Sequence, residues 1–474
     1  MAINRTEYIS TRGNADALDF AGVTLTGLAS DGGLYVPRHW PQFSTEEITA
    51  MRGLSYVDLA ARVMAPFTAG VLDEAELKGL CATAYGSFAH QAVAPLVQLD
   101  GQHWLLELFH GPTLAFKDVA LQFLGQLFDL LLEQRDEHIT IVGATSGDTG
   151  SAAIDGVKNC SRVKIVILYP EGRVSDVQRR QMTTVNSPNV KTLAVNGTFD
   201  DCQDLVKAMF NNQKFREQQR LSAVNSINWA RIMAQVVYYF SAAQQLASSG
   251  VSISNGVSFS VPTGNFGNVL SGWIARQMGA PIHQLIVGSN SNDILTRFFA
   301  TQEMRAQSVL PTLSPSMDIQ VSSNFERLLF EMNNRDGART ADQLGRFRSE
   351  GVFAVSPEQY NTWLAPVFRA ARCDDARTLE VIRDVFEKTG QLIDPHTAVG
   401  VFGARQHQSA DIPMVTLATA HAAKFPDAVE KATGSRPSLP AHLADLFDHE
   451  EYVTTVENDL EAVQNAVARF TSGA

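Results

Sequence analysis

The sequence has 474 residues, of which 45% are hydrophobic and 19% are charged, and its net charge at pH 7 is -12. This length suffices for two or three domains with buried cores, and the composition is that of a soluble globular enzyme. The acidic balance argues against binding to nucleic acid or to an anionic membrane, and no stretch has the length and apolarity of a membrane span. The four cysteines show no CxxC spacing, which predicts reduced, buried thiols in a cytoplasmic protein.

The N-terminal part has a helical pattern. Residues 44–91 are expected to be helical, with Thr45-Glu46-Glu47 at one start and Asp73-Glu74 at another. The stretch before them, residues 1–8, lacks the apolar region of a secretory signal, which also favours the cytoplasm. Arg12 and nearby small polar residues could hold an anion, and a structural turn explains them equally well. We expect an N-terminal domain over residues 1–95.

From about residue 96 onward, short apolar runs alternate with helix-length segments. The predicted strands are residues 138–143, 163–169, 190–195, 221–224, 256–261 and 282–287. The predicted helices between them are residues 116–134, 149–158, 174–183, 199–211, 229–247 and 268–278. Such alternation predicts a parallel sheet covered on both faces, with ligands beyond the carboxyl ends of its strands. Residues 96–290 are therefore expected to be the first part of an α/β core.

The remaining chain, from residue 291 onward, does not continue this regular alternation of strands and helices. Residues 291–392 are polar, carry a charged run, and are expected to form a mainly helical insertion. Residues 393–474 are expected to return to the α/β core through a buried strand at 414–417. They are expected to end in an amphipathic helix over 458–470, with Asn458 as its cap.

A lysine stands at a predicted loop-to-helix junction, in the run Phe109-His110-Gly111-Pro112-Thr113-Leu114-Ala115-Phe116-Lys117-Asp118. A helix N-terminus disfavours an ammonium group, so this position favours a neutral amine. A neutral lysine amine can bond covalently to an aldehyde cofactor. A solvated lysine at a helix start is the alternative, and Lys117 alone does not decide between the two.

Three further loops each follow a predicted strand and open a helix. Residues 144–150 and 262–268 are glycine-rich, so backbone N–H groups can converge where the helix N-terminus favours negative charge. Neither loop has the spacing of a P-loop or of a dinucleotide fingerprint. The third loop, residues 225–231, offers neutral donors and Arg231, unless it is only a capped helix with a surface arginine. Together with Lys117, these loops predict a phosphorylated cofactor and an anionic substrate.

Five motifs, in this order along the chain, resemble the threonine synthase family in its longer bacterial and fungal form, within the fold-type II pyridoxal-phosphate enzymes. They are His110–Asp118, Thr145–Gly150, Gly264–Asn268, Ser314–Ile319 with Ser323–Arg327, and Thr419–His421. The resemblance covers essentially the whole chain. It implies an α/β fold with two open, parallel-rich lobes and the cofactor in the cleft between them. A helical N-terminal unit and a helical insertion would complete this fold.

The resemblance also implies a role for each candidate residue. Lys117 would be catalytic and would carry pyridoxal 5'-phosphate. The other cofactor-binding residues would be Gly264, Asn265, Phe266, Gly267 and Asn268 at the phosphate and Thr419 at the pyridine nitrogen. Ser146, Asp148 and Thr149 would contact the substrate, and Asn225, Ser226 and Arg231 would hold its leaving phosphate; no metal is implied. Two departures are visible, because the wider fold type usually has Asn at the position of Asp148 and the family often has Pro where Ala422 stands.

The implied activity converts O-phospho-L-homoserine and water into L-threonine and phosphate by γ-elimination and β-hydration, the last step of threonine biosynthesis. The substrate amine would displace Lys117, whose amine would remove the Cα proton. Either Lys117 or the departing phosphate would serve Cβ. The alternative enzyme is a lyase that releases 2-oxobutyrate, ammonia and phosphate from the same substrate, and a catalytically silent interaction module is a third possibility. Whether the protein is a monomer or a homodimer stays open.

Overall fold

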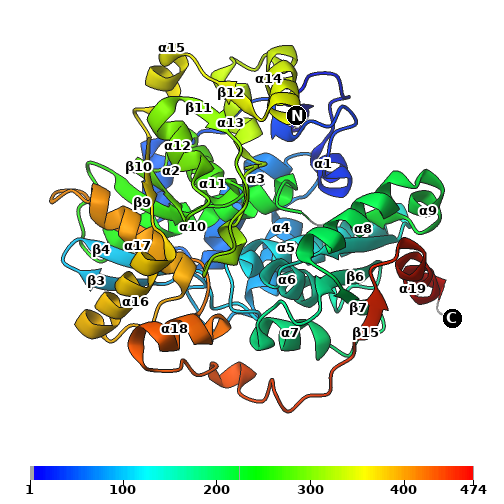
Figure 1. The fold of residues 1–474 in the computed structure, drawn as a ribbon. Coiled ribbons are helices and arrows are strands. Elements are labelled where there is room, and N and C mark those ends of the chain that lie inside the picture. The colour runs from blue at the N-terminus through cyan, green and yellow to red at the C-terminus, as the bar shows by residue number, and fades with distance from the viewer. Residues whose placement is uncertain (1–4, 224, 473–474) are drawn as a thin grey trace. The chain divides into compact units, whose positions relative to one another are not determined.

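The computed structural model describes residues 5–223 and 225–472, which form two compact units that alternate along the chain. The first unit comprises Met1–Cys81, His90–His110 and Ser226–Pro437. The second comprises Ala82–Ala89, Gly111–Asn225 and Ser438–Ala474. Each unit is built on its own sheet with helices packed against it (Figure 1).

The first unit holds most of the helices and the larger sheet. Its elements, where η marks a 3-10 or π helix, are β1 (Tyr8–Ser10), α1 (Phe20–Thr26), β2 (Tyr35–Pro37), α2 (Thr45–Ala50), α3 (Tyr56–Thr68), β3 (Leu96–Asp100), β4 (His103–Glu107), α10 (Trp229–Ser248), β9 (Val257–Pro262), α11 (Gly267–Gln277), β10 (Ile282–Ser289), α12 (Ile294–Thr301), β11 (Glu303–Arg305), η1 (Pro315–Met317), α13 (Phe325–Met332), α14 (Gly337–Glu350), β12 (Val352–Ala354), α15 (Pro357–Gln359), η2 (Tyr360–Leu364), β13 (Phe368–Arg372), α16 (Asp375–Thr389), α17 (Pro395–His407), β14 (Met414–Ala418), η3 (Ala422–Lys424) and α18 (Pro426–Thr433). Helix α4 (Glu74–Tyr85) includes residues of both units.

The six-stranded sheet of the first unit has the strand order β13-β10-β9-β14-β4-β3 and is parallel except for the pair β3 and β4. Successive side chains of a strand point to opposite faces, so a buried strand needs apolar cover on both. Strand β10 shows this directly. Leu285 lies against Gly272 of α11, whereas Ile286 lies against Gly403 of α17. Helices therefore cover both faces of this sheet, as predicted. The predicted strands do not form a single sheet, because 256–261 and 282–287 belong to this one and the earlier four belong to the sheet of the second unit.

Strand β13 (Phe368–Arg372) was not expected from the sequence. It forms the edge of the six-stranded sheet, parallel to β10, with Phe368 opposite Leu285. Its sequence Phe-Arg-Ala-Ala-Arg contains no β-branched residue, so the local pattern gives little strand signal. The segment 291–392 is thus rich in helices and also contributes a strand to the core sheet.

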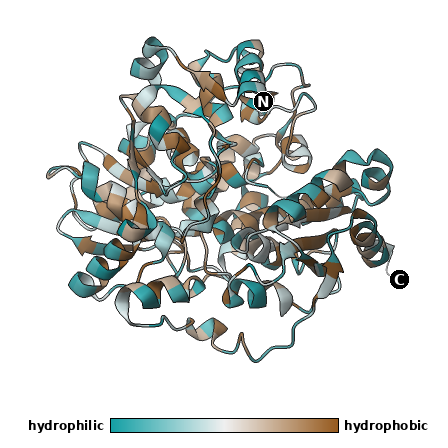
Figure 2. Cartoon of the chain, viewed as in Figure 1, coloured by the Kyte–Doolittle hydropathy of each residue, from teal (hydrophilic) through white to brown (hydrophobic). Residues whose placement is uncertain are grey.

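The second unit contains a smaller, fully parallel sheet. Its elements are α5 (Lys117–Arg135), β5 (Ile139–Ala144), α6 (Asp148–Val157), β6 (Val163–Pro170), α7 (Asp176–Thr183), β7 (Val190–Asn196), α8 (Phe199–Asn211), α9 (Gln213–Gln218), β8 (Leu221–Ser222), η4 (Ala441–Leu443), β15 (Thr454–Glu457) and α19 (Leu460–Ser472). The strand order is β15-β7-β6-β5-β8. Figure 2 shows β6 and β7 as largely hydrophobic ribbons. Val166 faces the cluster formed with α8 and α19, and its neighbour Ile167 faces α6.

Helices α5 and α6 touch backbone to backbone. A Cβ atom added at Gly125 would lie 1.9 Å from the carbonyl oxygen of Gly156, and one added at Gly156 would lie 2.5 Å from that of Leu121. Only glycine fits at either position, because real Cβ atoms do not approach backbone atoms so closely. This contact fixes the register between α5, which begins at Lys117, and α6, which begins at Asp148.

Most predicted element boundaries agree with the structure to within two residues, and α8 agrees at both ends. The predicted strand 221–224 is β8 (Leu221–Ser222), and Val224 lies outside the described residues. The predicted cap of the C-terminal helix is wrong. The N–H of Ala462 donates to Asp459 Oδ1 at 2.8 Å, so Asp459 and not Asn458 occupies the capping position of α19.

All four cysteines are buried free thiols. Across residues 5–223 and 225–472, no helix is both long and apolar enough to cross a membrane. The same residues contain no cluster of three or more His, Cys, Asp or Glu side chains placed to bind a metal ion.

Candidate functional site

Lys117 is a buried residue. It begins α5, and only 7% of its surface is exposed. Its Nζ atom lies 3.2 Å from Asp148 Oδ2 and 5.1 Å from the centre of the Phe116 ring. The alternative of a solvated helix-start lysine is therefore wrong, and the amine forms an ion pair in the second unit.

Asp148 has a second partner that sequence reasoning missed. Gln178 of α7 donates from Nε2 to Asp148 Oδ1 at 2.9 Å. The Gln178 amide is itself oriented by a capping box, in which the N–H of Ser175 donates to Gln178 Oε1 and the N–H of Gln178 donates to Ser175 Oγ, both at 3.2 Å. The sequence signal for this arrangement is a Ser followed three residues later by a Gln at a helix start. Gln178 therefore holds the carboxylate that faces Lys117.

The loop before Lys117 is fastened to the first turn of α5. Asp118 accepts two hydrogen bonds from Thr113, one from the backbone N–H at 2.9 Å and one from the hydroxyl at 2.5 Å. A Cβ atom at Gly111 would lie 2.4 Å from the Cβ atom of Asp118, so the position requires glycine. Asp118 thus shapes the loop that leads into the lysine.

The loop of residues 144–150 follows β5 in the same unit. The Thr145 hydroxyl accepts hydrogen bonds from the N–H groups of Gly147 at 3.0 Å and Gly150 at 2.9 Å. These two N–H groups are therefore used within the loop. The predicted substrate contacts Ser146 and Thr149 are half-buried beside Asp148 on this loop.

The predicted phosphate loop of the first unit, residues 262–268, connects β9 to α11. Phe266, the residue before α11, has a φ of 61°, in the left-handed region, so the chain turns sharply there. A Cβ atom at Gly264 would lie 2.6 Å from the carbonyl oxygen of Ser316, and the hydroxyl of Ser322 donates to the Gly264 carbonyl at 2.8 Å. Helix η1 and the segment after it therefore pack against this loop.

Asn268, in the first turn of α11, has an unsatisfied buried donor. The residue is 6% exposed, and its Nδ2 atom has no hydrogen-bond partner among the described residues. The hydroxyl of Tyr238 donates to Asn268 Oδ1, and the hydroxyl of Tyr239 donates to the Asn268 carbonyl at 2.7 Å. The side-chain oxygen is bonded, and the amino group remains available for an anion.

Asn324 links this loop to the loop that leads into α10. Its Nδ2 atom donates to the carbonyl oxygens of Ser226 at 3.0 Å and Asn265 at 3.1 Å. Arg327, one turn later, donates from Nη1 to Asn324 Oδ1 at 2.5 Å and from Nη2 to the Ile227 carbonyl at 2.7 Å. Both residues belong to the Ser323–Arg327 motif, whose structural role the sequence did not reveal.

Arg231 is also buried, so the alternative of a surface arginine is wrong. It is 3% exposed, and burial lowers the pKa of its guanidinium to about 10. Its Nε and Nη1 atoms have no hydrogen-bond partner in the part of the chain that the structure describes. Asn228 caps the helix start, accepting from the N–H of Ala230 at 3.0 Å. Ser226 and Arg231 belong to the first unit, and Asn225 belongs to the second.

Thr419 lies directly after β14, at the carboxyl end of a central strand, and is 5% exposed. The last residue of this motif, His421, caps the short helix η3 by accepting from the N–H of Ala423 at 3.1 Å. Its ring packs edge-on against Phe109, with the ring centres 5.3 Å apart. Ala422 begins η3 without disturbing this geometry.

Arg12 does not offer an anion site. Its Nη2 atom lies 3.0 Å from Glu326 Oε2, and its Nε atom donates to Glu326 Oε1 at 3.1 Å. The Thr11 hydroxyl donates to the same carboxylate at 2.6 Å. Two of the three guanidinium nitrogens therefore bind Glu326, which supports the structural interpretation of Arg12 over an anion site.

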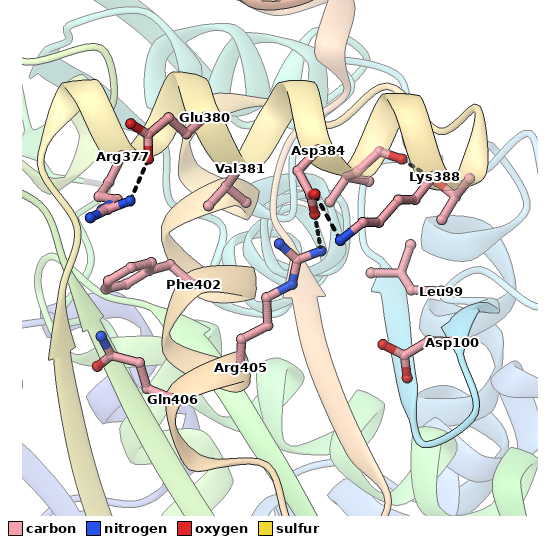
Figure 3. A pocket seen from close by; sticks show the side chains of 12 residues that line it. Leu99, Asp100, Arg377, Glu380, Val381, Asp384, Lys388, Phe402, Arg405 and Gln406 are labelled. Atoms are coloured by element: carbon pink, nitrogen blue, oxygen red, sulfur yellow. Dashed lines mark hydrogen bonds and ion pairs between the residues drawn. The ribbon is translucent and has the colours of Figure 1, made fainter.

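A separate pocket of about 640 Å³ lies on the first unit, beside α16, α17 and the β3–β4 hairpin (Figure 3). Its cations are paired with its own carboxylates: Arg377 with Glu380 at 2.5 Å, and both Lys388 and Arg405 with Asp384 at 2.8 Å. None of the predicted site residues lines it. The pocket is therefore distinct from the candidate site.

Comparison with known proteins gives three family matches that cover most of the chain. Residues 7–85 match the threonine synthase N terminus, residues 88–344 the pyridoxal-phosphate dependent enzyme family, and residues 397–467 the threonine synthase C-terminal family. A threonine synthase of Pseudomonas aeruginosa is 54% identical over 98% of this chain and 98% of its own length.

Two solved structures are also similar over nearly their full lengths. The pyridoxal-phosphate-bound threonine synthase of Brucella melitensis superposes with a TM-score of 0.95 at 50% identity, covering 98% of this chain and 99% of that one. The yeast threonine synthase superposes with a TM-score of 0.93 at 39% identity, covering 99% of each chain. The predicted fold class and family are thereby confirmed, and the chain belongs to the threonine synthase family of pyridoxal-phosphate-dependent enzymes.

Proposed function

We propose that this chain converts O-phospho-L-homoserine and water into L-threonine and phosphate, with pyridoxal 5'-phosphate as its cofactor. The observation that carries the proposal is the amine of Lys117, buried at the start of α5 and 3.2 Å from Asp148 Oδ2. Burial disfavours the charged form of a lysine, and the neutral amine is the form that attacks an aldehyde, whereas the carboxylate of Asp148 positions the side chain and opposes this effect. The family to which the chain belongs depends on that cofactor.

The residues present fit pyridoxal phosphate. Its phosphate needs hydrogen-bond donors, and the first turn of α11 offers backbone N–H groups together with the unpartnered Nδ2 atom of Asn268. We assign the phosphate to the loop formed by Gly264, Asn265, Phe266, Gly267 and Asn268. We assign the pyridine nitrogen to Thr419, because a hydroxyl can donate a hydrogen bond there and has no charge that would favour a protonated ring.

The substrate brings a second phosphate, and Arg231 is the group that we assign to it. With a pKa of about 10 the guanidinium remains charged at neutral pH, and its buried Nε and Nη1 atoms are free of protein partners within the described chain. Each of these N–H groups can donate a charge-assisted hydrogen bond to a phosphate oxygen. We assign Asn225 and Ser226 to the same phosphate, and Ser146, Asp148 and Thr149 to the amino-acid part of the substrate.

When bound, pyridoxal phosphate withdraws electrons from the substrate's Cα and makes its neighbouring protons acidic. In the proposed reaction, Lys117 removes and later returns the Cα proton. Asp148, held by Gln178, keeps the lysine side chain in place. The Cγ–O bond to phosphate breaks, Cγ gains a proton and Cβ loses one. The oxygen of water then bonds to Cβ, and the proton that this water releases ends on the free phosphate. Arg231 holds the phosphate through bond cleavage, and the buried setting limits access of water before the correct step.

The test is to incubate the cofactor-loaded enzyme with O-phospho-L-homoserine and to quantify the organic product and the released phosphate. Threonine equal in amount to phosphate would establish the proposal. Phosphate with 2-oxobutyrate and ammonia would show the alternative lyase, and absence of phosphate release would contradict both. Lys117→Ala should retain no cofactor after borohydride treatment, whereas Lys158→Ala, which removes a partly exposed lysine paired with Asp155, should retain it. Borohydride-fixed cofactor in Lys117→Ala would refute the lysine assignment.

We further propose a cytoplasmic location, because the four buried thiols suit a reducing compartment. The proposed partners are the substrate alone, without nucleic acid or membrane, in a monomer or a homodimer. Light scattering of the purified protein would distinguish these two states.

A further inference from the structure

The amide of Asn268 is held in one orientation by neighbours that the proposed reaction does not use. Tyr238 and Tyr239 lie on α10 and are fully buried. Burial raises the pKa of both phenols well above the ordinary value, so each hydroxyl keeps its proton and donates at neutral pH.

Each hydroxyl has one hydrogen to donate. The hydrogen of Tyr239 goes to the Asn268 carbonyl at 2.7 Å, which is closer than its 3.2 Å contact with Oδ1. The hydrogen of Tyr238 goes to Oδ1. Oxygen and nitrogen of a side-chain amide are assigned by their partners, and here the Tyr238 donor assigns the oxygen. The amino group must then face away from the tyrosine, where it has no partner among the described residues.

The reversed amide would be unfavourable at an anion site. It would turn the carbonyl oxygen of Asn268 toward a phosphate and leave the hydrogen of the Tyr238 hydroxyl without an acceptor among the described residues, even though its oxygen could accept from the amide. We propose that Tyr238 is a positioning residue for cofactor binding, which fixes the Asn268 amide so that its Nδ2 atom donates to the phosphate of pyridoxal phosphate. This inference rests on the proposed function, because it takes the loop 264–268 to be the cofactor's phosphate site.

The experiment measures the dissociation constant of pyridoxal phosphate and the phosphorus NMR shift of the bound cofactor. Four variants are compared with the wild type: Tyr238→Phe, Asn268→Ala, the double variant, and Tyr360→Phe. The last is a matched control, since it removes another tyrosine hydroxyl of the first unit, one that donates to the Phe299 carbonyl at 2.9 Å. Reversal of the amide costs about one hydrogen bond, so Tyr238→Phe should weaken cofactor binding about five- to tenfold. It should also move the phosphorus shift, and Tyr360→Phe should change neither.

The double variant distinguishes an effect of Tyr238 on the orientation of the Asn268 amide from a general effect of Tyr238 on the fold. If Tyr238 acts through the amide, Tyr238→Phe should change the dissociation constant by less than about twofold in the Asn268→Ala background. An equal loss in both backgrounds would overturn the inference. A second result would also overturn it: Asn268→Ala binds the cofactor weakly, but Tyr238→Phe has the dissociation constant and the phosphorus shift of the wild type. Unchanged binding and an unchanged shift in Asn268→Ala would instead refute the proposed cofactor site itself, and the inference with it.

A second measurement needs no variant. A high-resolution crystal structure of the wild-type holoenzyme should place one end of the Asn268 amide on the cofactor phosphate and the other on the Tyr238 hydroxyl. An amide that contacts only one of these two groups would overturn the inference even if Tyr238→Phe failed to fold.

Discussion

The buried charge of Arg231 should destabilise the cofactor-free protein, and replacing this residue should therefore stabilise it. Burial lowers the pKa of its guanidinium from 12.5 to about 10, a difference that corresponds to about 3 kcal/mol of unfavourable transfer. Methionine has a similar length, no charge and no unsatisfied donor. We therefore expect Arg231→Met to raise the free energy of unfolding of the cofactor-free protein, by at most about 3 kcal/mol. The same change should abolish activity at ordinary substrate concentrations.

The assay is equilibrium unfolding in urea, with and without inorganic phosphate. A ligand present at 100 times its dissociation constant stabilises the folded state by about 2.7 kcal/mol. Phosphate should therefore raise the unfolding midpoint of the wild type and raise that of Arg231→Met less.

The chain supplies its own control. Burial lowers the pKa of Arg327 to about 9, yet its guanidinium donates to the carbonyl oxygens of Tyr35 at 2.9 Å and Ile227 at 2.7 Å. Arg327→Met would leave these buried carbonyls without their donors, so it should lower the unfolding midpoint. If Arg231→Met also lowered the midpoint, or if phosphate stabilised it as much as the wild type, the reasoning would be refuted.

Three further predictions concern Asp148, Asn324 and His103, a buried histidine of β4. Asp148→Asn removes the negative charge that favours the ammonium form of Lys117. Because only the neutral amine attacks the aldehyde, the pH midpoint for cofactor incorporation should move downward. An absorbance–pH profile like that of the wild type would contradict this prediction. Asn324→Ala removes two hydrogen bonds, each of which contributes about 1 kcal/mol, to the loops that contain Asn265 and Ser226. The cofactor dissociation constant and the KM for O-phospho-L-homoserine should therefore rise together. A change in only one of the two constants would show that the two loops are independent. Burial lowers the pKa of His103 from 6.5 to about 4, so the folded state binds fewer protons than the unfolded state between these pH values. The free energy of unfolding should therefore fall by about 3 kcal/mol as the pH drops from 6.5 to 4. Urea unfolding of His103→Gln should show a weaker dependence of this free energy on pH.

Local pattern was sufficient for the strands and helices predicted between residues 116 and 287, because their hydrophobic periods are regular. It failed where the local signal was weak or shared. Strand β13 has a sequence that suits a helix equally well, and its place at the sheet edge comes from pairing with a strand about 80 residues earlier. The cap of α19 was misplaced by one residue because Asn458 and Asp459 are both good capping residues.

For the candidate site, the motifs identified residues but not their surroundings. Burial of Arg231 depends on packing around α10, which no local pattern contains. Gln178, Tyr238 and Asn324 were missed because each acts through a neighbour. Only Gln178 left a local trace, in the spacing of its capping box. The roles assigned by resemblance and the domain boundaries at 95, 290 and 392 stay predictions.

The contact between Gly125 and Gly156 also determines how the second unit tolerates mutation. Gly125 lies eight residues after Lys117, which is about 12 Å along the helix axis. Even an alanine there would push α5 and α6 apart and separate the amine from its carboxylate. A screen that scores only growth without added threonine would therefore report both glycines as essential, at positions remote from the chemistry.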